Sequence, residues 1–237
     1  MFDRPPVFLG IDTNYWIYFA KGDHPKALNE IMKKIDTNEY KIITCKFVIK
    51  EWENGIAQTR EEVKKDIYEQ SKNAYKISEF LKGAEKENFT NILNRYKNQE
   101  KERLKIADER IEKIDRIIKS NSIIAPITSR VKDLVITHGV EKKAPFRTKN
   151  GTADALIFFS AVEYLKEKKD DGWKSSIFVS NNHKDFSKSK QEKETIDPDL
   201  QPYLDECKMY YERNIAKALN LAKEIEDDID KYMDYEY

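Results

Sequence analysis

The stretch around which this chain is organised reads Val7-Phe8-Leu9-Gly10-Ile11-Asp12-Thr13-Asn14. In it, a short apolar run leads directly into a carboxylate. An apolar run without alternation is typical of a strand buried on both faces, as in a parallel sheet. Ligands of open α/β sheets bind just outside the carboxyl ends of the strands. Asp12 is therefore a candidate site residue, and the alternative is that it only caps the helix that follows.

The composition indicates a chain rich in solvated helices. Charged residues make up 36% of the 237 residues, compared with about 25% in typical globular domains. Lys and Arg total 43 and so do Asp and Glu, which leaves a net charge of zero. The overall charge gives no reason to expect nucleic-acid binding, so any basic surface must be local.

Several classes of protein are disfavoured by the sequence. The cysteines, Cys45 and Cys207, lie far apart, and the three histidines are scattered, so neither type shows zinc-binding spacing. Two such cysteines are typical of a reduced, cytoplasmic protein. There is no signal-peptide pattern and no run of 18 apolar residues, so we expect no membrane contact.

The hydrophobic pattern predicts an α/β fold, with a central parallel β-sheet flanked by helices. We expect strands at residues 7–11, 40–45, 176–179 and 209–211, with helices between them. Residues 56–122 differ, because apolar residues recur at helical spacing among many charges. We expect a long helical hairpin inserted in one domain that spans residues 1–237. This stretch holds 16 basic and 13 acidic residues from 56 to 119, which favours a solvated face over a nucleic-acid arm.

Glu51 and Asp154 are further candidate site residues. Glu51 follows the second predicted strand on a helix whose buried stripe includes Val48 and Trp52, and it lies at the edge of that stripe. Glu53 lies about 200° further round the helix, so we expect it to face water. Asp154 opens a helix that continues as ALIFFSAV, which is apolar on all sides and should be buried. For Asp154, the alternative is an ordinary first-turn acid.

The strand at residues 176–179 repeats the pattern seen at Asp12. It breaks into polar residues, Ser180 to Phe186, which include Asn182 and Asp185. Asp12, Glu51, Asp154 and Asp185 then all fall at strand ends or helix starts. Like charges gathered in one cleft repel each other, and a hard divalent cation such as Mg²⁺ or Mn²⁺ would resolve the repulsion.

One dense basic patch precedes Asp154. Four cations lie within eight residues, together with Pro145, Phe146 and Gly151: Lys142, Lys143, Arg147 and Lys149. Such a loop can bind phosphates, although lysine-rich loops also serve solubility.

These motifs, in this order, resemble a PIN domain, a fold shared by many metal-dependent nucleases. The matching stretches are GIDTN at residues 10–14, VIKEW at 48–52, GTADALI at 151–157 and FVSNNHKDF at 178–186. The resemblance covers about residues 1–55 and 125–220, and is closest to large bacterial PIN-like proteins with a helical insertion. It implies a three-layer PIN-like fold.

The resemblance also implies roles for individual residues. Asp12, Glu51 and Asp154 would hold the metal, with Asn14, Ser180 and Asn182 as secondary site residues. Many relatives place a fourth acid two residues after a Ser or Thr, where this chain has Asn182. Asp185 could take that duty, so the site could hold one metal or two. The basic patch would bind the phosphates of the substrate.

The activity implied is that of a metal-dependent endonuclease using Mg²⁺ or Mn²⁺, acting on RNA, in a setting such as toxin action or phage defence. The first alternative is a structure-specific DNA nuclease. The second is a catalytically weak nucleic-acid-binding or scaffold protein. A homo-oligomer or a protein partner bound through the helical insertion is also compatible with the sequence. A phosphatase of the Asp-x-Asp type is disfavoured, because Asn14 stands where its second acid would be.

Overall fold

The computed structural model describes residues 5–147, 151–168 and 176–235, with side chains up to residue 231. The described strands form one five-stranded sheet in the order β3-β2-β1-β4-β5, and every neighbouring pair is parallel. The bounds are β1 Val7–Ile11, β2 Tyr40–Cys45, β3 Ser122–Ala125, β4 Ser176–Val179 and β5 Met209–Glu212. The predicted parallel α/β fold is confirmed.

The central strands are buried on both faces, as their unbroken apolar sequences require. All five residues of β1 and all four of β4 are buried. Strand β3 was not expected: the predicted hairpin ends at Ser122, and the sequence pattern assigns residues 123–125 to no element. Its partner β2 fixes it by parallel pairing from Ile42 with Ser122 to Cys45 with Ala125.

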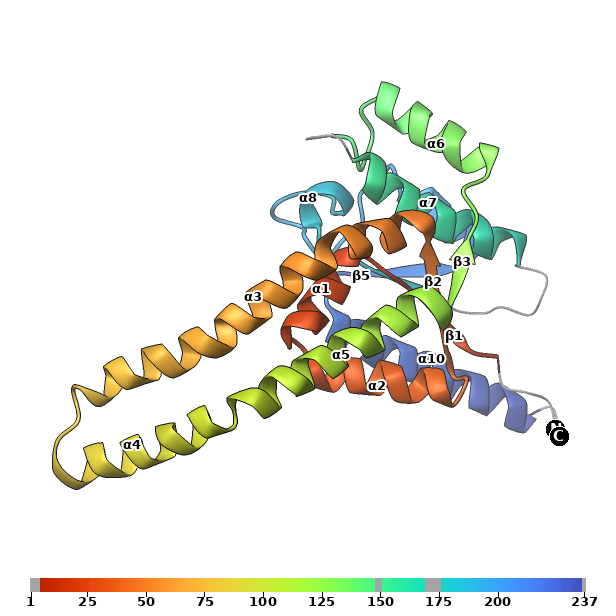
Figure 1. The fold of residues 1–237 in the computed structure, drawn as a ribbon. Helices are drawn as coiled ribbons and strands as arrows, with labels where there is room; N and C mark the ends of the chain where they lie inside the picture. The colour runs from red at the N-terminus through yellow and green to blue at the C-terminus, as the bar shows by residue number, and fades with distance from the viewer. Residues whose placement is uncertain (1–4, 148–150, 169–175, 236–237) are drawn as a thin grey trace.

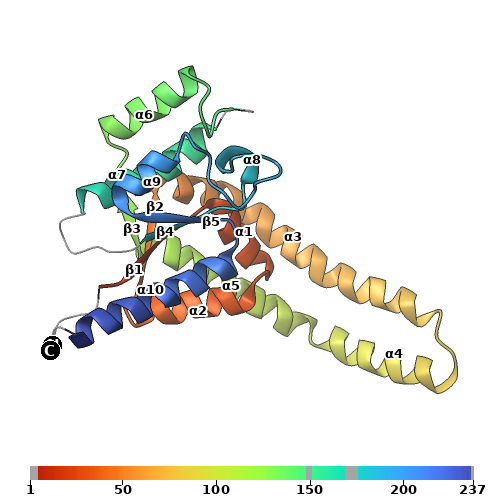
Figure 2. The ribbon, with the colours of Figure 1, turned by 180° about the vertical axis from the view of Figure 1, so that it is seen from behind.

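Helices cover both faces of the sheet and make three layers. α6 (Ser129–Val140), α7 (Thr152–Glu167) and α9 (Gln201–Cys207) lie on one side, and α2 (Pro25–Asp36) and α10 (Ile215–Tyr235) on the other (Figures 1 and 2). α7 is buried along most of its length, as its uniformly apolar sequence predicts. Aromatic rings of α7, β4 and the short α8 (His183–Phe186) pack together: the Phe158 and Phe178 centroids lie 5.2 Å apart, and those of Phe178 and Phe186 lie 5.1 Å apart.

A helical hairpin projects from this body (Figure 1). One arm is α3 (Lys46–Ser78), and the other is α4 (Gly83–Asn98) followed by α5 (Glu100–Ser120). α3 is continuous, so the helix that carries Glu51 extends into the projecting arm. The far part of α5 returns to the body, where Ile111, Ile114, Ile117 and Ile118 belong to the main hydrophobic core.

The sheet order places a topological switch point between β1 and β4. The chain leaves β1 for β2 on one side, and later enters β4 on the other side of β1. In open parallel sheets, the crevice at the carboxyl end of such a switch point is where ligands bind. α1 (Thr13–Lys21) begins there, directly after Asp12.

Candidate active site

Asp12 lies at the switch point and does more than start a helix. It occupies the N-cap position of α1, but its side chain makes no capping hydrogen bond. Instead, Ser180 at the end of β4 donates its Oγ–H to Oδ2 of Asp12 at 2.7 Å. The Asp12 side chain therefore joins the carboxyl ends of β1 and β4, and helix capping does not explain its position.

The environment of Asp12 disfavours a negative charge. The residue is only 3% exposed. Burial raises the pKa of Asp12 above its ordinary value of 3.8; the Ser180 hydrogen bond opposes this rise, and the charge of Glu51 adds to it. A buried carboxylate beside a second carboxylate is an arrangement that a bound cation stabilises.

Glu51 approaches Asp12 from α3. Val48 and Trp52 are fully buried, and Trp52 donates its indole N–H to Asp115 at 2.9 Å. These contacts fix the rotation of the helix, and Glu51 accepts a hydrogen bond from Thr13 at 2.6 Å. Glu53 faces away and pairs with Lys119 at 3.2 Å.

Asp154 enters from the first turn of α7. The side-chain amide of Asn182 donates to Asp154 at 3.2 Å and to Asp185 at 2.6 Å. Gly151, the N-cap of α7, is required by the close approach of the preceding loop, because a Cβ there would lie 2.4 Å from the carbonyl oxygen of Pro145.

A cleft of about 440 Å³ brings these groups together. The residues that line it come from the starts of α1, α3 and α7 and the end of β4: Asp12, Thr13, Asn14, Ile17, Glu51, Asn54, Gly55, Asp154 and Asn182. Asp185 is not among them; it is 3% exposed and hydrogen-bonded to Asn182. Of the two residues proposed to complete the acid set, Asn182 is therefore the one in the cleft.

The donor chemistry of the cleft fits a hard divalent cation. Three carboxylates and three amide side chains line it, and oxygen ligands of this kind suit Mg²⁺ and Mn²⁺. Within the described residues, no group of three His, Cys, Asp or Glu side chains is close enough to hold a metal ion as the side chains stand. Metal binding would therefore require the carboxylates to rotate towards one another.

The structure separates the members of the basic patch. Arg147 donates to Asp197 at 2.9 Å and to Asp199 at 2.7 Å, and Lys143 pairs with Glu141 at 2.5 Å. Both cations already have carboxylate partners in the protein. Lys142 is exposed, and Lys149 lies outside the described residues.

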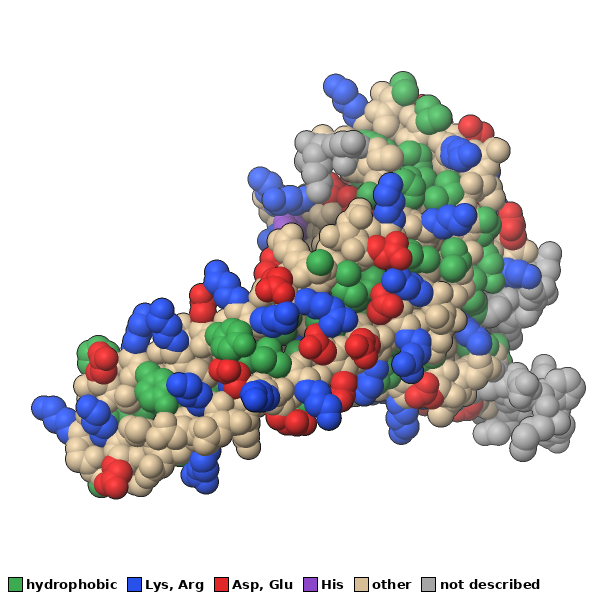
Figure 3. All heavy atoms as spheres, viewed as in Figure 1, with side chains coloured by type: hydrophobic (Ala, Val, Ile, Leu, Met, Phe, Trp, Pro, Cys, Tyr) green, Lys and Arg blue, Asp and Glu red, His purple; other side chains and the backbone are tan. Residues whose placement is uncertain are grey.

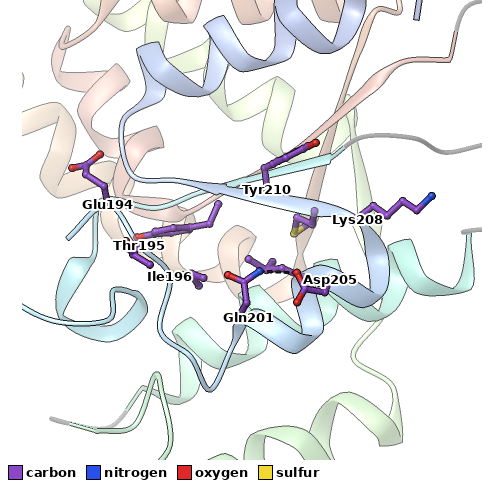
Figure 4. A pocket seen from close by; sticks show the side chains of 10 residues that line it. Glu194, Thr195, Ile196, Gln201, Asp205, Lys208 and Tyr210 are labelled. Carbon is purple, nitrogen blue, oxygen red and sulfur yellow. Dashed lines mark hydrogen bonds between the residues drawn. The ribbon is translucent and has the colours of Figure 1, made fainter. Parts of the chain in front are cut away.

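A second, larger cavity of about 610 Å³ runs along the edge strand β5 (Figure 4). It is lined by residues between Glu194 and Tyr211, and none of the candidate site acids is among them. Tyr211 connects the two regions, because its hydroxyl donates to the carbonyl oxygen of Ser180 at 3.3 Å. The candidate carboxylates Asp12, Glu51 and Asp154 line the smaller cleft.

An acidic cleft at the switch point of a three-layer parallel α/β fold has oxygen donors of the kind that bind a hard cation. The PIN domain family model matches residues 9–186, which is well over half of the chain, and the chain belongs to that family. PIN domains are generally nucleases that typically use divalent metal ions, and they therefore bind nucleic acid. No curated protein and no solved structure matches the chain. Among the described residues, no helix is both long and apolar enough to cross a membrane.

The structure adds cleft residues that sequence reasoning did not single out. Thr13 contacts Glu51 directly, and Ile17, Asn54 and Gly55 form part of the cleft wall. Thr13 lies next to Asp12 in the opening motif, but nothing in the sequence paired it with Glu51, which lies 38 residues away. Gly55 did carry a signal, because glycine is uncommon in the middle of a helix.

Proposed function

We propose that this protein is a metal-dependent endonuclease that hydrolyses phosphodiester bonds in RNA, using Mg²⁺ or Mn²⁺. The observation that carries the proposal is the convergence of Asp12, Glu51 and Asp154 in one cleft at the switch point. Asp12, Glu51 and Asp154 supply the carboxylate ligands. A bound divalent ion would supply a water of lowered pKa and a counter-charge for the phosphate.

Three neutral side chains hold the acids in place. Ser180 holds Asp12, Thr13 holds Glu51, and Asn182 holds Asp154. Partners of this kind orient metal ligands and typically affect metal affinity or activity by about 10–100-fold. We assign Asp185 a supporting role through Asn182. We assign phosphate binding to Lys142, which is exposed, because Lys143 and Arg147 have partners within the protein. Lys149 is included in this proposal only because it belongs to the same basic patch in the sequence.

The choice of RNA rests on the resemblance to ribonucleases of this family, as does a role in toxin action or phage defence in the cytoplasm. The hairpin offers a surface for a second copy or a protein partner. Figure 3 shows Lys and Arg alternating with Asp and Glu along it, and such a mixed surface does not favour nucleic acid.

The test is a cleavage assay on the full chain. Labelled single-stranded RNA and a flap DNA of the same length are incubated with Mn²⁺, with Mg²⁺ and with EDTA. We expect cleavage of the RNA that depends on the metal and stops in EDTA. Preferential cleavage of the flap DNA would identify the structure-specific DNA nuclease instead.

A second candidate function is favoured by one observation. Asn182 stands in the cleft and its amide already binds two of the acids, so a protein that binds nucleic acid with little or no cleavage is compatible with this site. Binding of RNA without cleavage under every metal condition would support that candidate.

A further inference from the structure

Gly55 leaves part of the cleft wall without a side chain. It lies inside the long helix α3, well away from either end. Among the described glycines, only Gly22 and Gly83 have positive φ, so the backbone at Gly55 is open to any residue. A Cβ built at Gly55 meets no heavy atom within 4 Å. Neither backbone conformation nor internal packing requires glycine here, although glycine weakens a helix relative to alanine.

The cleft lining around this gap combines uncharged side chains with the three carboxylates, and Glu51 lies about one turn before Gly55 on α3. Ile17 of α1 and the amide side chains of Asn14 and Asn54 line the cleft together with Gly55. Along α3 beyond the gap, Glu62 accepts from Gln58 at 2.7 Å and pairs with Lys21, also at 2.7 Å. This neighbouring charge is already neutralised, and no cation lines the cleft.

The chemistry of the gap suits one part of a nucleotide better than the rest. A phosphate gains little from an apolar side chain and two amides beside three carboxylates. A base with its sugar has flat apolar faces and hydrogen-bonding edges, which pack against such surfaces and pair with amide groups. The absence of a Cβ at Gly55 lets a flat group approach the helix backbone closely.

We propose that the gap between Ile17 and Gly55, flanked by Asn14 and Asn54, binds the nucleoside next to the phosphate that is cleaved. This inference rests on the proposed nuclease function and adds the part of the substrate that the cleft recognises. Gly55 is then a residue that keeps this subsite open.

The test compares Gly55→Gln with Ala57→Gln in the full chain. Ala57 is exposed and lies about 200° from Gly55 around the same helix, so the control adds the same side chain away from the cleft. Binding of a labelled single-stranded RNA is measured in EDTA by fluorescence anisotropy over a range of salt concentrations. A second oligomer of the same length carries the sugar-phosphate backbone without bases.

We expect Gly55→Gln to weaken RNA binding by roughly tenfold, the scale of one lost base contact. The salt dependence should keep the wild-type slope, because no phosphate contact is lost. The base-free oligomer should bind wild type and Gly55→Gln equally, and Ala57→Gln should match wild type with both oligomers. Mn²⁺ binding followed by electron paramagnetic resonance should be the same in all three proteins.

Three results would overturn the subsite: wild-type RNA affinity in Gly55→Gln, an equal loss with the base-free oligomer, or a fall in Mn²⁺ affinity. If Gly55→Gln does not fold, Gly55→Ala carries the same comparison, because alanine favours the helix. Failure of wild type to cleave any substrate with Mn²⁺ refutes the proposed function itself. Cleavage by wild type together with unchanged RNA binding by Gly55→Gln refutes only the subsite.

Discussion

Replacing Asp12 with Asn should leave the metal-free protein as stable as wild type or more stable. Asn keeps an oxygen that can accept the Ser180 hydrogen bond, which is 2.7 Å long in wild type. It removes a charge that is 3% exposed and repelled by Glu51. The usual loss from a point mutation, about 1 kcal/mol, should therefore be absent in EDTA.

The effect of pH follows from the raised pKa of Asp12. The folded protein holds the Asp12 proton more tightly than the unfolded chain, whose pKa is near 3.8. The stability that this proton contributes is complete below pH 3.8 and is lost as pH rises through the raised folded pKa. Relative to wild type, Asp12→Asn should therefore gain stability as pH rises through that range and keep the gain at neutral pH.

Adding Mn²⁺ should reverse the order of the two proteins. At a free metal concentration a hundred times the dissociation constant, wild type gains roughly 2.7 kcal/mol by linkage. For a chain of this size, that gain corresponds to a rise in melting temperature of roughly 5–10 °C. Asp12→Asn should gain much less, and the two melting temperatures should converge or cross. Equal Mn²⁺ shifts, or a variant less stable than wild type in EDTA at every pH, would refute this reasoning.

Three further predictions follow from particular contacts. Thr13→Val removes the 2.6 Å hydrogen bond to Glu51. This variant should lower Mn²⁺ affinity, measured by titration calorimetry, or the cleavage rate by about 10–100-fold. Wild-type values in both assays would show that Thr13 does not position Glu51. Arg147→Gln should destabilise the fold by about 1–3 kcal/mol in urea melts, because the buried Asp197 loses its ion-pair partner. Lys142→Gln should leave stability unchanged and reduce the salt slope of RNA binding by about one unit. The opposite pattern would make Arg147 the phosphate contact. Replacing residues 66–105 with a short linker should leave a folded core that binds Mn²⁺. Replacing residues 56–122 should not leave a folded core, because the core then loses Ile111, Ile114, Ile117 and Ile118. An insoluble product from the shorter deletion would show that the core depends on the whole hairpin.

The elements of the sheet could largely be predicted from the sequence, because buried parallel strands leave unbroken apolar runs. The bounds of β1, β2 and β4 match the expected ranges. Strand β3 was missed because its four residues follow a helical pattern without a clear break, and it is recognisable only from its pairing with β2.

The candidate site was predictable where one residue sits at a strand end or helix start, as Asp12 and Asp154 do. Contacts between distant segments were not predictable. The Thr13–Glu51 and Asn182–Asp154 hydrogen bonds depend on how α1, α3, α7 and the end of β4 pack at the carboxyl edge of the sheet. Likewise, the sequence showed a dense basic patch, but not that Arg147 is bound to Asp197 and Asp199.

The most direct test of the proposed metal-dependent nuclease activity compares the rates of RNA cleavage by Asp154→Asn, Glu53→Gln and wild type in Mn²⁺. Asp154 lines the acidic cleft, whereas Glu53 faces away and pairs with Lys119. We predict that Asp154→Asn loses at least about a hundredfold in rate, since a metal ligand should matter at least as much as the groups that support it. Glu53→Gln should cleave like wild type. Full activity in Asp154→Asn, or an equal loss in both variants, would contradict the assignment of the cleft as the active site.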